Sequence, residues 1–331
     1  MKRNVYLKPH LKNIAVALIC FLIVVILNFA LPRLLPGDPV AYLTGFAEED
    51  LSPVQYEYYR NALHLNENIF VQFGYYIKSL FDGTLGYSFK KESPVSTLIG
   101  ERLGYTLQIT LPAIIISSLI GLLWGLACGY KKNSATDKIS TSAQILLNSM
   151  PTFAIGLILI IALSFKSKIF PYSGLNSSDV SAGSFEYFTD RLYHLFLPVL
   201  TLVLATLPSK YLLMRNTAAQ FTDDKSVTFA KQRGLSNTKI KYNYVLKNIS
   251  QPFITSVGLS ISTCIGGSVI IENIFSINGM GMLLTDAVHT LDYPLMQGIL
   301  FVTAAIMAVS VIISDVICIF IDPKVRKGGS L

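Results

Sequence analysis

Charged residues are scarce in this chain of 331 residues: Asp, Glu, Lys and Arg make up only 14% of it, whereas 52% of the residues are hydrophobic. Average soluble domains carry about 25% charged residues. This shortfall and the mean hydropathy of +0.51 indicate a membrane protein. The net charge of +7 fits either nucleic-acid binding or basic loops on one side of a membrane, so the distribution of the charges must decide.

Cysteine is also rare and is not clustered. The four cysteines lie in separate apolar runs without CxxC or Cys/His spacing: Cys20, Cys128, Cys264 and Cys318. A disulfide framework or a zinc site needs clustered ligands with polar flanks. The pattern therefore favours small buried side chains over a metal site or a set of disulfides.

The sequence contains no GxxxxGK[ST] phosphate loop, no HExxH and no GxSxG, and its four histidines are scattered. We therefore expect the chain not to hydrolyse ATP itself and to bind no cofactor or metal of its own. Energy for transport would have to come from an ion gradient or from a partner. A secondary carrier, a membrane-embedded enzyme and a partner-driven permease all stay open at this point.

Long apolar runs dominate what is present. A membrane-spanning helix needs about 20 mostly apolar residues. Runs of this kind predict an all-α polytopic membrane protein with about six spans. The predicted spans are 13–31, 105–129, 142–165, 193–214, 253–276 and 295–321.

The Lys and Arg residues divide unequally between the two sides of these spans. One side, made of 1–12, 131–138, 210–252 and 322–331, carries 18 of the 27, and the other side carries nine. The side that is richer in Lys and Arg faces the cytoplasm. Both termini and the basic loop 210–252 are therefore predicted to be cytoplasmic, and nucleic-acid binding becomes a minor alternative.

The segment 32–104 is the longest on the predicted outer side. Ser52 followed by Pro53 is a helix start signal, and an amphipathic aromatic stretch follows and ends near Gly83. We expect helices that lie on the outer face. Contact with lipid headgroups and docking of a partner explain the aromatic residues equally well.

Four charged residues fall in or near the predicted spans. An ion-coupled carrier needs buried acids in its spans, and Glu272 and Asp315 are the candidates for a pathway or a gate. Neither has an obvious basic partner within the membrane, so hydrogen bonds between helices or at a gate are the preferred interpretation. Lys210 and Arg215 are expected to extend toward the headgroups.

Glycine recurs every four residues in the second span, at Gly121, Gly125 and Gly129. This spacing puts the three on one helix face, where another backbone can come close. The pattern predicts helix packing and says little about substrate.

The basic loop has an internal design. Residues 227–233 can form two helical turns, and Gly234 suits the left-handed conformation that ends a helix. Ser236 or Thr238 can begin a second short helix, which Pro252 is expected to end. If the loop served only to fix the orientation of the chain in the membrane, its positive charges would be enough, and it would not need this helix–Gly–helix arrangement.

Here the residues match a known family. The stretch "AKQRGLSNTKIKYNYVLKN" resembles the cytoplasmic signature loop of ABC-importer permeases, in which a helix–Gly–helix docks into a groove on the ATPase subunit. Ordered motifs along nearly the whole chain narrow the resemblance to the B-type permeases of the dipeptide/oligopeptide/nickel family. They are "LPGDP", "DGTLGYSF", "PVSTLIGERLGYTLQIT", "SMPTFAIG", "HLFLPVLTL", "GGSVIIENIFSINGMGMLLTDAVHTLDYP" and "DPKVR".

Six residues occupy positions of the family's loop pattern and are implied by the resemblance to couple the chain to an ATPase: Ala230, Gly234, Leu235, Leu246, Asn248 and Pro252. Three positions depart from the pattern. Thr228 stands where Arg is usual, Phe229 where Thr is usual, and Tyr244 where His is usual. The departures leave the detailed contacts of this loop open.

The resemblance also implies an assembly. It implies a type I ABC-importer permease arrangement, with one transmembrane permease domain over 1–331 in the bacterial inner membrane. The expected partners are a second homologous permease, two ATP-binding subunits that hold ATP and Mg²⁺, an extracytoplasmic binding protein and lipid. The expected substrates are short peptides, or a related small solute such as nickel or its chelate.

Overall fold

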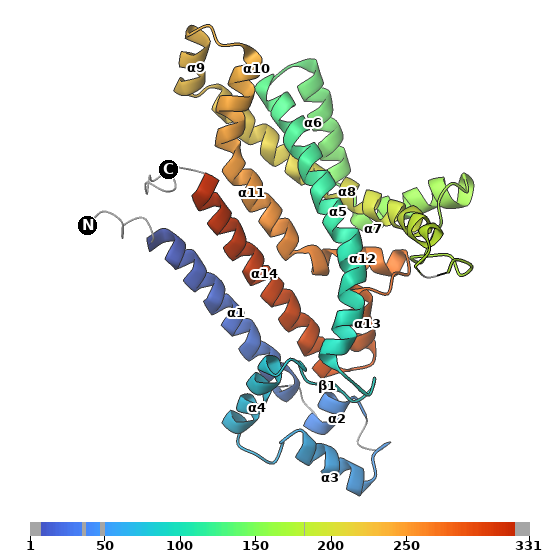
Figure 1. The fold of residues 1–331 in the computed structure, drawn as a ribbon. Coiled ribbons are helices and arrows are strands. Elements are labelled where there is room, and N and C mark those ends of the chain that lie inside the picture. Colours follow the sequence, from blue (N-terminus) through green and yellow to red (C-terminus); the bar gives the residue numbers. More distant parts are fainter. Residues whose placement is uncertain (1–7, 35–37, 47–49, 182, 322–331) are drawn as a thin grey trace.

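The computed structural model describes residues 8–34, 38–46, 50–181 and 183–321. The motif "LPGDP" lies partly outside these ranges, and most of the predicted cytoplasmic N-terminus and the whole tail 322–331 lie outside them. Within them the chain is almost entirely helical (Figure 1). The one sheet there is a short antiparallel pair, β1 (Tyr87–Ser88) with β2 (Ser93–Pro94). The prediction of an all-α protein is confirmed.

Four long helices form the body of the molecule. They are α1 (Lys8–Leu34), α5 (Val95–Tyr130), α8 (Phe185–Thr222) and α14 (Tyr293–Ile321). Figure 1 shows α1 beside α14, and α5 running lengthwise along the molecule toward β1. In the described part, α5, α8 and α14 are long and apolar enough to cross a membrane, whereas the apolar stretch of α1, Ile14–Ala30, is shorter.

The third predicted span is not one straight helix. Its residues divide between α6 (Ala135–Asn148) and α7 (Thr152–Leu159), which continues as the π-helical turn η2 (Ile160–Lys166).

 The two halves meet at an angle of 98°, and Pro151 begins the second half. A hydropathy window cannot detect such a bend, because the residues at the break carry no charge. If this bent pair counts as one span, the described part has four candidate spans, so the number six stays a prediction.

The fifth predicted span is also broken. It divides at Thr263 into α11 (Leu246–Ser262) and α12 (Cys264–Ile274). A further short helix, α13 (Met280–His289), connects α12 to α14. The breaks at Pro151 and Thr263 therefore leave helix ends inside apolar sequence, where backbone groups need partners.

The segment between α1 and α5 forms the end of the molecule opposite to α9 (Lys225–Gln232) and α10 (Asn237–Ile240) (Figure 1). It contains α2 (Pro39–Thr44), α3 (Pro53–Ala62) and α4 (Ile69–Phe81). Ser52 begins α3 with a full capping box, as the sequence predicts. Because α3 has no buried residues, this helix lies on the surface of the chain.

Helix α4 contacts the C-terminal end of α1. The Arg33 guanidinium lies 3.9 Å from the centre of the Phe29 ring, and its Nε donates to Gln72 Oε1 at 3.0 Å. Burial lowers the pKa of Arg33 to about 10 and raises the pKa of Tyr76 to about 12. Both groups therefore keep their ordinary protonation at neutral pH, and Arg33 stays a cation.

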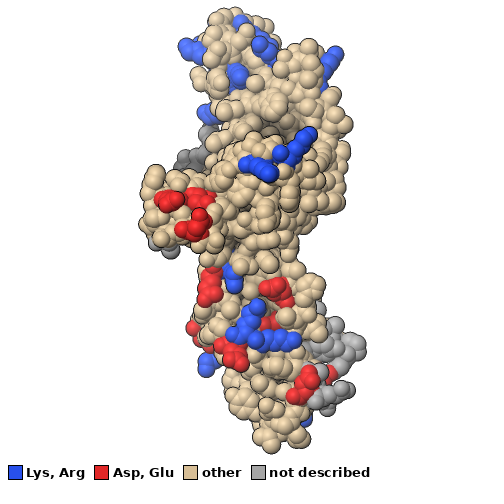
Figure 2. Space-filling model, turned by 90° about the vertical axis from the view of Figure 1, so that its right-hand side faces the viewer, with Lys and Arg blue, Asp and Glu red and all other residues tan. Residues whose placement is uncertain are grey.

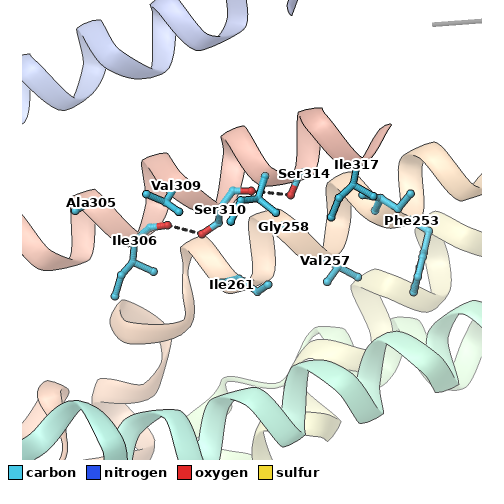
Figure 3. A pocket seen from close by; sticks show the side chains of 12 residues that line it. Phe253, Val257, Gly258, Ile261, Ala305, Ile306, Val309, Ser310, Ser314 and Ile317 are labelled. Atoms are coloured by element: carbon cyan, nitrogen blue, oxygen red, sulfur yellow. Dashed lines mark hydrogen bonds between the residues drawn. The ribbon is translucent and has the colours of Figure 1, made fainter. Parts of the chain in front are cut away.

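Helices α11 and α14 lie side by side around an apolar groove of about 490 Å³ (Figure 3). They come close where Gly258 faces α14: a Cβ at Gly258 would lie 1.7 Å from Ser314 Oγ. The hydroxyls of Ser310 and Ser314 donate to carbonyls of their own helix, Ile306 O and Ser310 O. The groove wall thus offers few polar groups, which makes it a poor path for a polar solute.

Candidate functional site

The basic loop folds into a compact helical element. It consists of α9 (Lys225–Gln232), Gly234 with φ of +72°, and α10 (Asn237–Ile240). Asp224 caps α9 and Ser236 caps α10 through side-chain oxygens. A Cβ at Gly234 would meet nothing within 4 Å, so glycine is favoured there by its backbone conformation and not by lack of space. We call α9, Gly234 and α10 the coupling element.

The coupling element is fixed to the body of the molecule by its apolar side. Ala230 and Ile240 are fully buried in a cluster with Met214 and Ala218 of α8 and Leu126 of α5. Leu235 and Leu246 pack against the same cluster. Ala230 and Leu235 are two of the six residues predicted to couple the chain to an ATPase. In the structure they attach the coupling element to α5 and α8.

The opposite side of the element is exposed. Phe229 is 60% exposed, and the Arg233 guanidinium lies 5.9 Å from the centre of its ring. Figure 2 shows only Lys and Arg among the charged side chains at the end that carries the element, whereas both signs appear at the opposite end. The exposed side thus offers a basic surface with one aromatic side chain and the backbone of Gly234.

The second helix of the element does not end at Pro252, and that expectation is wrong. Helix α10 continues through the π-helical turn η3 (Lys241–Val245) into α11, which contains Pro252. Tertiary packing outweighs the tendency of proline to end a helix, because Ile249, three residues before Pro252, is fully buried. The Asn248 side chain donates to Tyr244 O at 2.8 Å within the widened turn. Helix α10 of the element, η3 and α11 therefore form one continuous helix.

The glycines of α5 lie against the backbone of α8. A Cβ on Gly121 would come within 3.2 Å of Tyr211 N, and one on Gly129 within 2.4 Å of Arg215 O. A Cβ on Gly125 would lie 2.8 Å from both Tyr211 O and Met214 Cβ. The four-residue spacing on α5 thus matches successive turns of α8, and no larger side chain fits between the two helices without a shift.

This contact gives a prediction about stability. Gly125→Ala forces a methyl group against the α8 backbone, so we expect a loss of about 1–3 kcal/mol and a lower Tm of the purified protein. Gly104→Ala on the same helix is the control, because its Cβ would meet nothing within 4 Å. The control should leave Tm unchanged or raise it, and equal shifts in both variants would contradict close packing as the cause.

Glu272 lies at the centre of a buried network at the end of α12. Its side chain is fully buried, and Oε1 accepts hydrogen bonds from Thr106 Oγ1 at 2.7 Å and Ser268 Oγ at 2.8 Å. Its Oε2 accepts from the backbone N–H groups of Gly281 at 2.7 Å and Met282 at 3.0 Å. Glu272 thus joins α5 and α12 and caps the N-terminus of α13, where a negative charge is favoured.

The glycines of the motif "NGMGM" make room for this carboxylate. A Cβ at Gly279 would lie 2.6 Å from the Glu272 carboxyl carbon, and one at Gly281 would lie 2.5 Å from Val269 Cα. The N–H of Met280 donates to Thr106 Oγ1 at 2.8 Å. The first three N–H groups of α13 are therefore all satisfied by two side chains, and none of the described Lys and Arg residues pairs with Glu272.

The second candidate acid lies elsewhere. Asp315 lines a groove between α1 and α14, together with Cys20 and Phe21. Glu272 belongs to the network beside α13, and the structure does not bring the two acids together. A relay of protons or sodium ions between them has no support in this arrangement.

Lys210 and Arg215 do not extend to the headgroups, and this expectation is wrong for both. Lys210 is 5% exposed, and its Nζ donates to Ser117 Oγ and Ser118 Oγ, each at 2.8 Å, and to Ile114 O at 3.3 Å. Arg215 forms a bidentate ion pair with the buried Asp137 of α6 at 2.8 and 2.5 Å. Because α8 continues to Thr222, both cations face neighbouring helices instead of the membrane surface.

Comparison with known proteins shows the family to which the chain belongs. Residues 117–327 match the family described as binding-protein-dependent transport system inner membrane component. The chain belongs to this family. It is therefore a multi-pass inner-membrane protein and the permease of an importer that works as part of a transport system.

This inner membrane component is similar over nearly its whole length to permeases of that kind. It is 28% identical to the dipeptide transport system permease protein DppB of Lactococcus lactis, over 96% of this chain and 99% of that protein. It is 29% identical to the oligopeptide transport system permease protein AppB of Bacillus subtilis, over 92% and 94%. It is 27% identical to the dipeptide transport system permease protein DppB of Escherichia coli, over 96% and 98%.

Two more motifs of this inner membrane component meet in space. Ser88 of "DGTLGYSF" is fully buried, and its hydroxyl donates to the Asp292 carboxylate of "HTLDYP" at 2.5 Å. Asp292 also accepts from the Leu295 N–H at 3.2 Å and so caps α14. Sequence reasoning did not single out Ser88, Asp292 or Thr106, because a serine–aspartate or threonine–glutamate pair leaves no signal in the charge pattern.

Proposed function

We propose that this chain is the membrane-spanning permease subunit of an ATP-driven importer and forms half of a pathway for short peptides. In this proposal the coupling element and both termini face the cytoplasm, and α2–α4 face outward. The excess of Lys and Arg at the end with the element supports this orientation. The relatives named above carry dipeptides and oligopeptides in their names, and they support peptides as the solute.

One observation carries the proposal: the coupling element packs firmly on the body of the chain, has an exposed basic side, and is joined through α10 to α11 by an unbroken helix. A partner that moves the element must move α11 with it. Coupling of this kind is a difference in free energy between inward- and outward-facing states, which the partner biases.

The partners of the proposal are a second homologous permease, two ATP-binding subunits and an extracytoplasmic binding protein. ATP and Mg²⁺ belong to the ATP-binding subunits, and the single transmembrane domain 1–331 hydrolyses no ATP itself. The outward segment is suited to contact the binding protein, because Val54 on α3 and Phe70 and Phe81 on α4 are each at least 80% exposed. Such apolar side chains on a surface mark contact with a partner or with lipid.

The deciding experiment is purification of the tagged chain in mild detergent, followed by reconstitution into proteoliposomes with its co-purifying subunits and binding protein. We expect a phosphate-loop ATPase and a second permease to co-purify. We expect uptake of labelled tri-alanine that requires ATP and binding protein. Uptake by the chain alone, driven by a proton or sodium gradient, would replace the proposal with an ion-coupled carrier.

A further inference from the structure

A small polar cavity of about 180 Å³ lies where α5, α7, α8 and α11 meet. Its wall differs from that of the apolar groove between α11 and α14, since Lys210 lines it together with five residues that carry hydroxyl groups. Four of these hydroxyls each donate to the carbonyl four residues earlier, on Thr110, Thr206, Ser260 and Thr263, and the fifth belongs to Thr152. Polar groups that converge in a membrane protein interior mark a pathway or a binding site.

The charge of Lys210 is not balanced within the described part of the chain. Its three hydrogen bonds go to two hydroxyls and a carbonyl, and none of the described carboxylates lies within ion-pair distance of it. The three neutral oxygens hold the ammonium in place but supply no negative charge. A buried cation without a counter-charge costs several kcal/mol, so the site favours an anionic group that enters the cavity.

The cavity also lies at both breaks in the spans. Thr152 is the first residue of α7, and Thr263 is the residue between α11 and α12. At Thr263 the C-terminus of α11 meets the N-terminus of α12, so the two dipole ends oppose each other there, whereas the N-terminus of α7 begins at Thr152 without a side-chain cap. The N-terminus of α7 therefore supplies a positive dipole end and N–H donors, which suit a carboxylate.

We propose that this cavity, the Lys210 cavity, is a transit site for the carboxylate of the peptide being carried. The inference rests on the proposed function, which supplies the peptide. The three N–H groups of Lys210 are all in use, so it donates the charge-assisted hydrogen bond in exchange for its 3.3 Å bond to the carbonyl of Ile114, which also lines the cavity. The hydroxyl of Thr152, which has no acceptor within its own short helix, adds a neutral donor. Binding there is transient, because the carboxylate leaves with the solute.

A cysteine reporter tests the charge preference without reference to transport. The four native cysteines are replaced by alanine, and Thr206→Cys is added in the intact reconstituted complex. Rates of modification by an anionic and a cationic methanethiosulfonate reagent are then compared with their rates on free cysteine. We expect the anionic-to-cationic ratio to fall at least about tenfold when Lys210→Met is added, and Lys210→Arg to keep it.

Uptake provides the second measurement. With wild-type binding protein, Lys210→Met should lower tri-alanine uptake at least about tenfold, while Lys210→Arg restores part of it at equal abundance in the membrane. An unchanged reagent ratio in Lys210→Met overturns the inference and leaves Lys210 as a link between α5 and α8. A preference for the cationic reagent in the intact complex also overturns it, because it reveals an acid of another subunit beside Lys210.

Failure of the proposed function is distinguishable from failure of this inference. If the wild-type complex takes up no tri-alanine but the reporter keeps its Lys210-dependent preference for the anionic reagent, the peptide proposal fails and an anion site remains. If tri-alanine uptake is normal and the ratio does not depend on Lys210, the importer stands and the Lys210 cavity is not a carboxylate site.

Discussion

Gly234→Asp is expected to reduce ATP-driven uptake to background while the protein inserts into the membrane at its normal level. The side chain would enter open space, and an L-residue at a φ of +72° costs only about 1 kcal/mol, so the fold should survive. The exposed side of the coupling element would change in shape and in charge. Uptake in proteoliposomes and co-purification of the ATPase measure the effect.

The chain offers a matched control for this prediction. Gly183 has a φ of +86°, a Cβ there would also meet nothing within 4 Å, and it lies outside both the coupling element and the segment with α2–α4. Gly183→Asp should therefore carry the same backbone strain and the same new charge without loss of coupling. Normal uptake in Gly234→Asp, or equal loss in both variants, would contradict a specific role of the coupling element.

Glu272→Leu is expected to lower the amount of folded protein more than any other substitution considered. It leaves the N–H groups of Gly281 and Met282 without acceptors in a buried position and removes the partner of Thr106. A loss of about 3 kcal/mol or more follows from the desolvation of these groups. Membrane abundance and the Tm of the purified complex are the measurements.

Two comparisons sharpen this second prediction. Glu272→Gln keeps the size and one acceptor oxygen, so it should lie between the wild type and Glu272→Leu. Asp286→Leu removes an exposed acid from the neighbouring α13 and should leave Tm nearly unchanged. A stable Glu272→Leu protein that has lost transport would instead make Glu272 a group of the pathway.

Local signals predicted the coupling element well. Gly234 and Ser236 determine the backbone through their own conformational and capping preferences, which depend on neighbours within four residues. The same kind of local signal gives the wrong helix end at Pro252, which lies inside α11. Its effect depends on packing around Ile249, which involves residues far away in the chain.

The positions of the charged groups within the spans could not be predicted in the same way. Lys210 sits four residues before Met214 and five before Arg215, so its stretch looked like the end of a span. Only the length of α8 and its contact with α5 direct the ammonium toward Ser117. Glu272 lacked an apparent partner because its donors are hydroxyls and backbone N–H groups, two of them from Thr106 and Gly281 on other helices.

The continuity of α10, η3 and α11 has a mechanical consequence. From Asn237 to Ser262 the helix is about 39 Å long at 1.5 Å per residue, so it acts as a lever arm. A tilt of about 10° at the coupling element would displace the far end by about 7 Å on this length. Thr263 follows that far end directly and lines the Lys210 cavity, so a small rotation of the coupling element would produce a large displacement at the proposed carboxylate site.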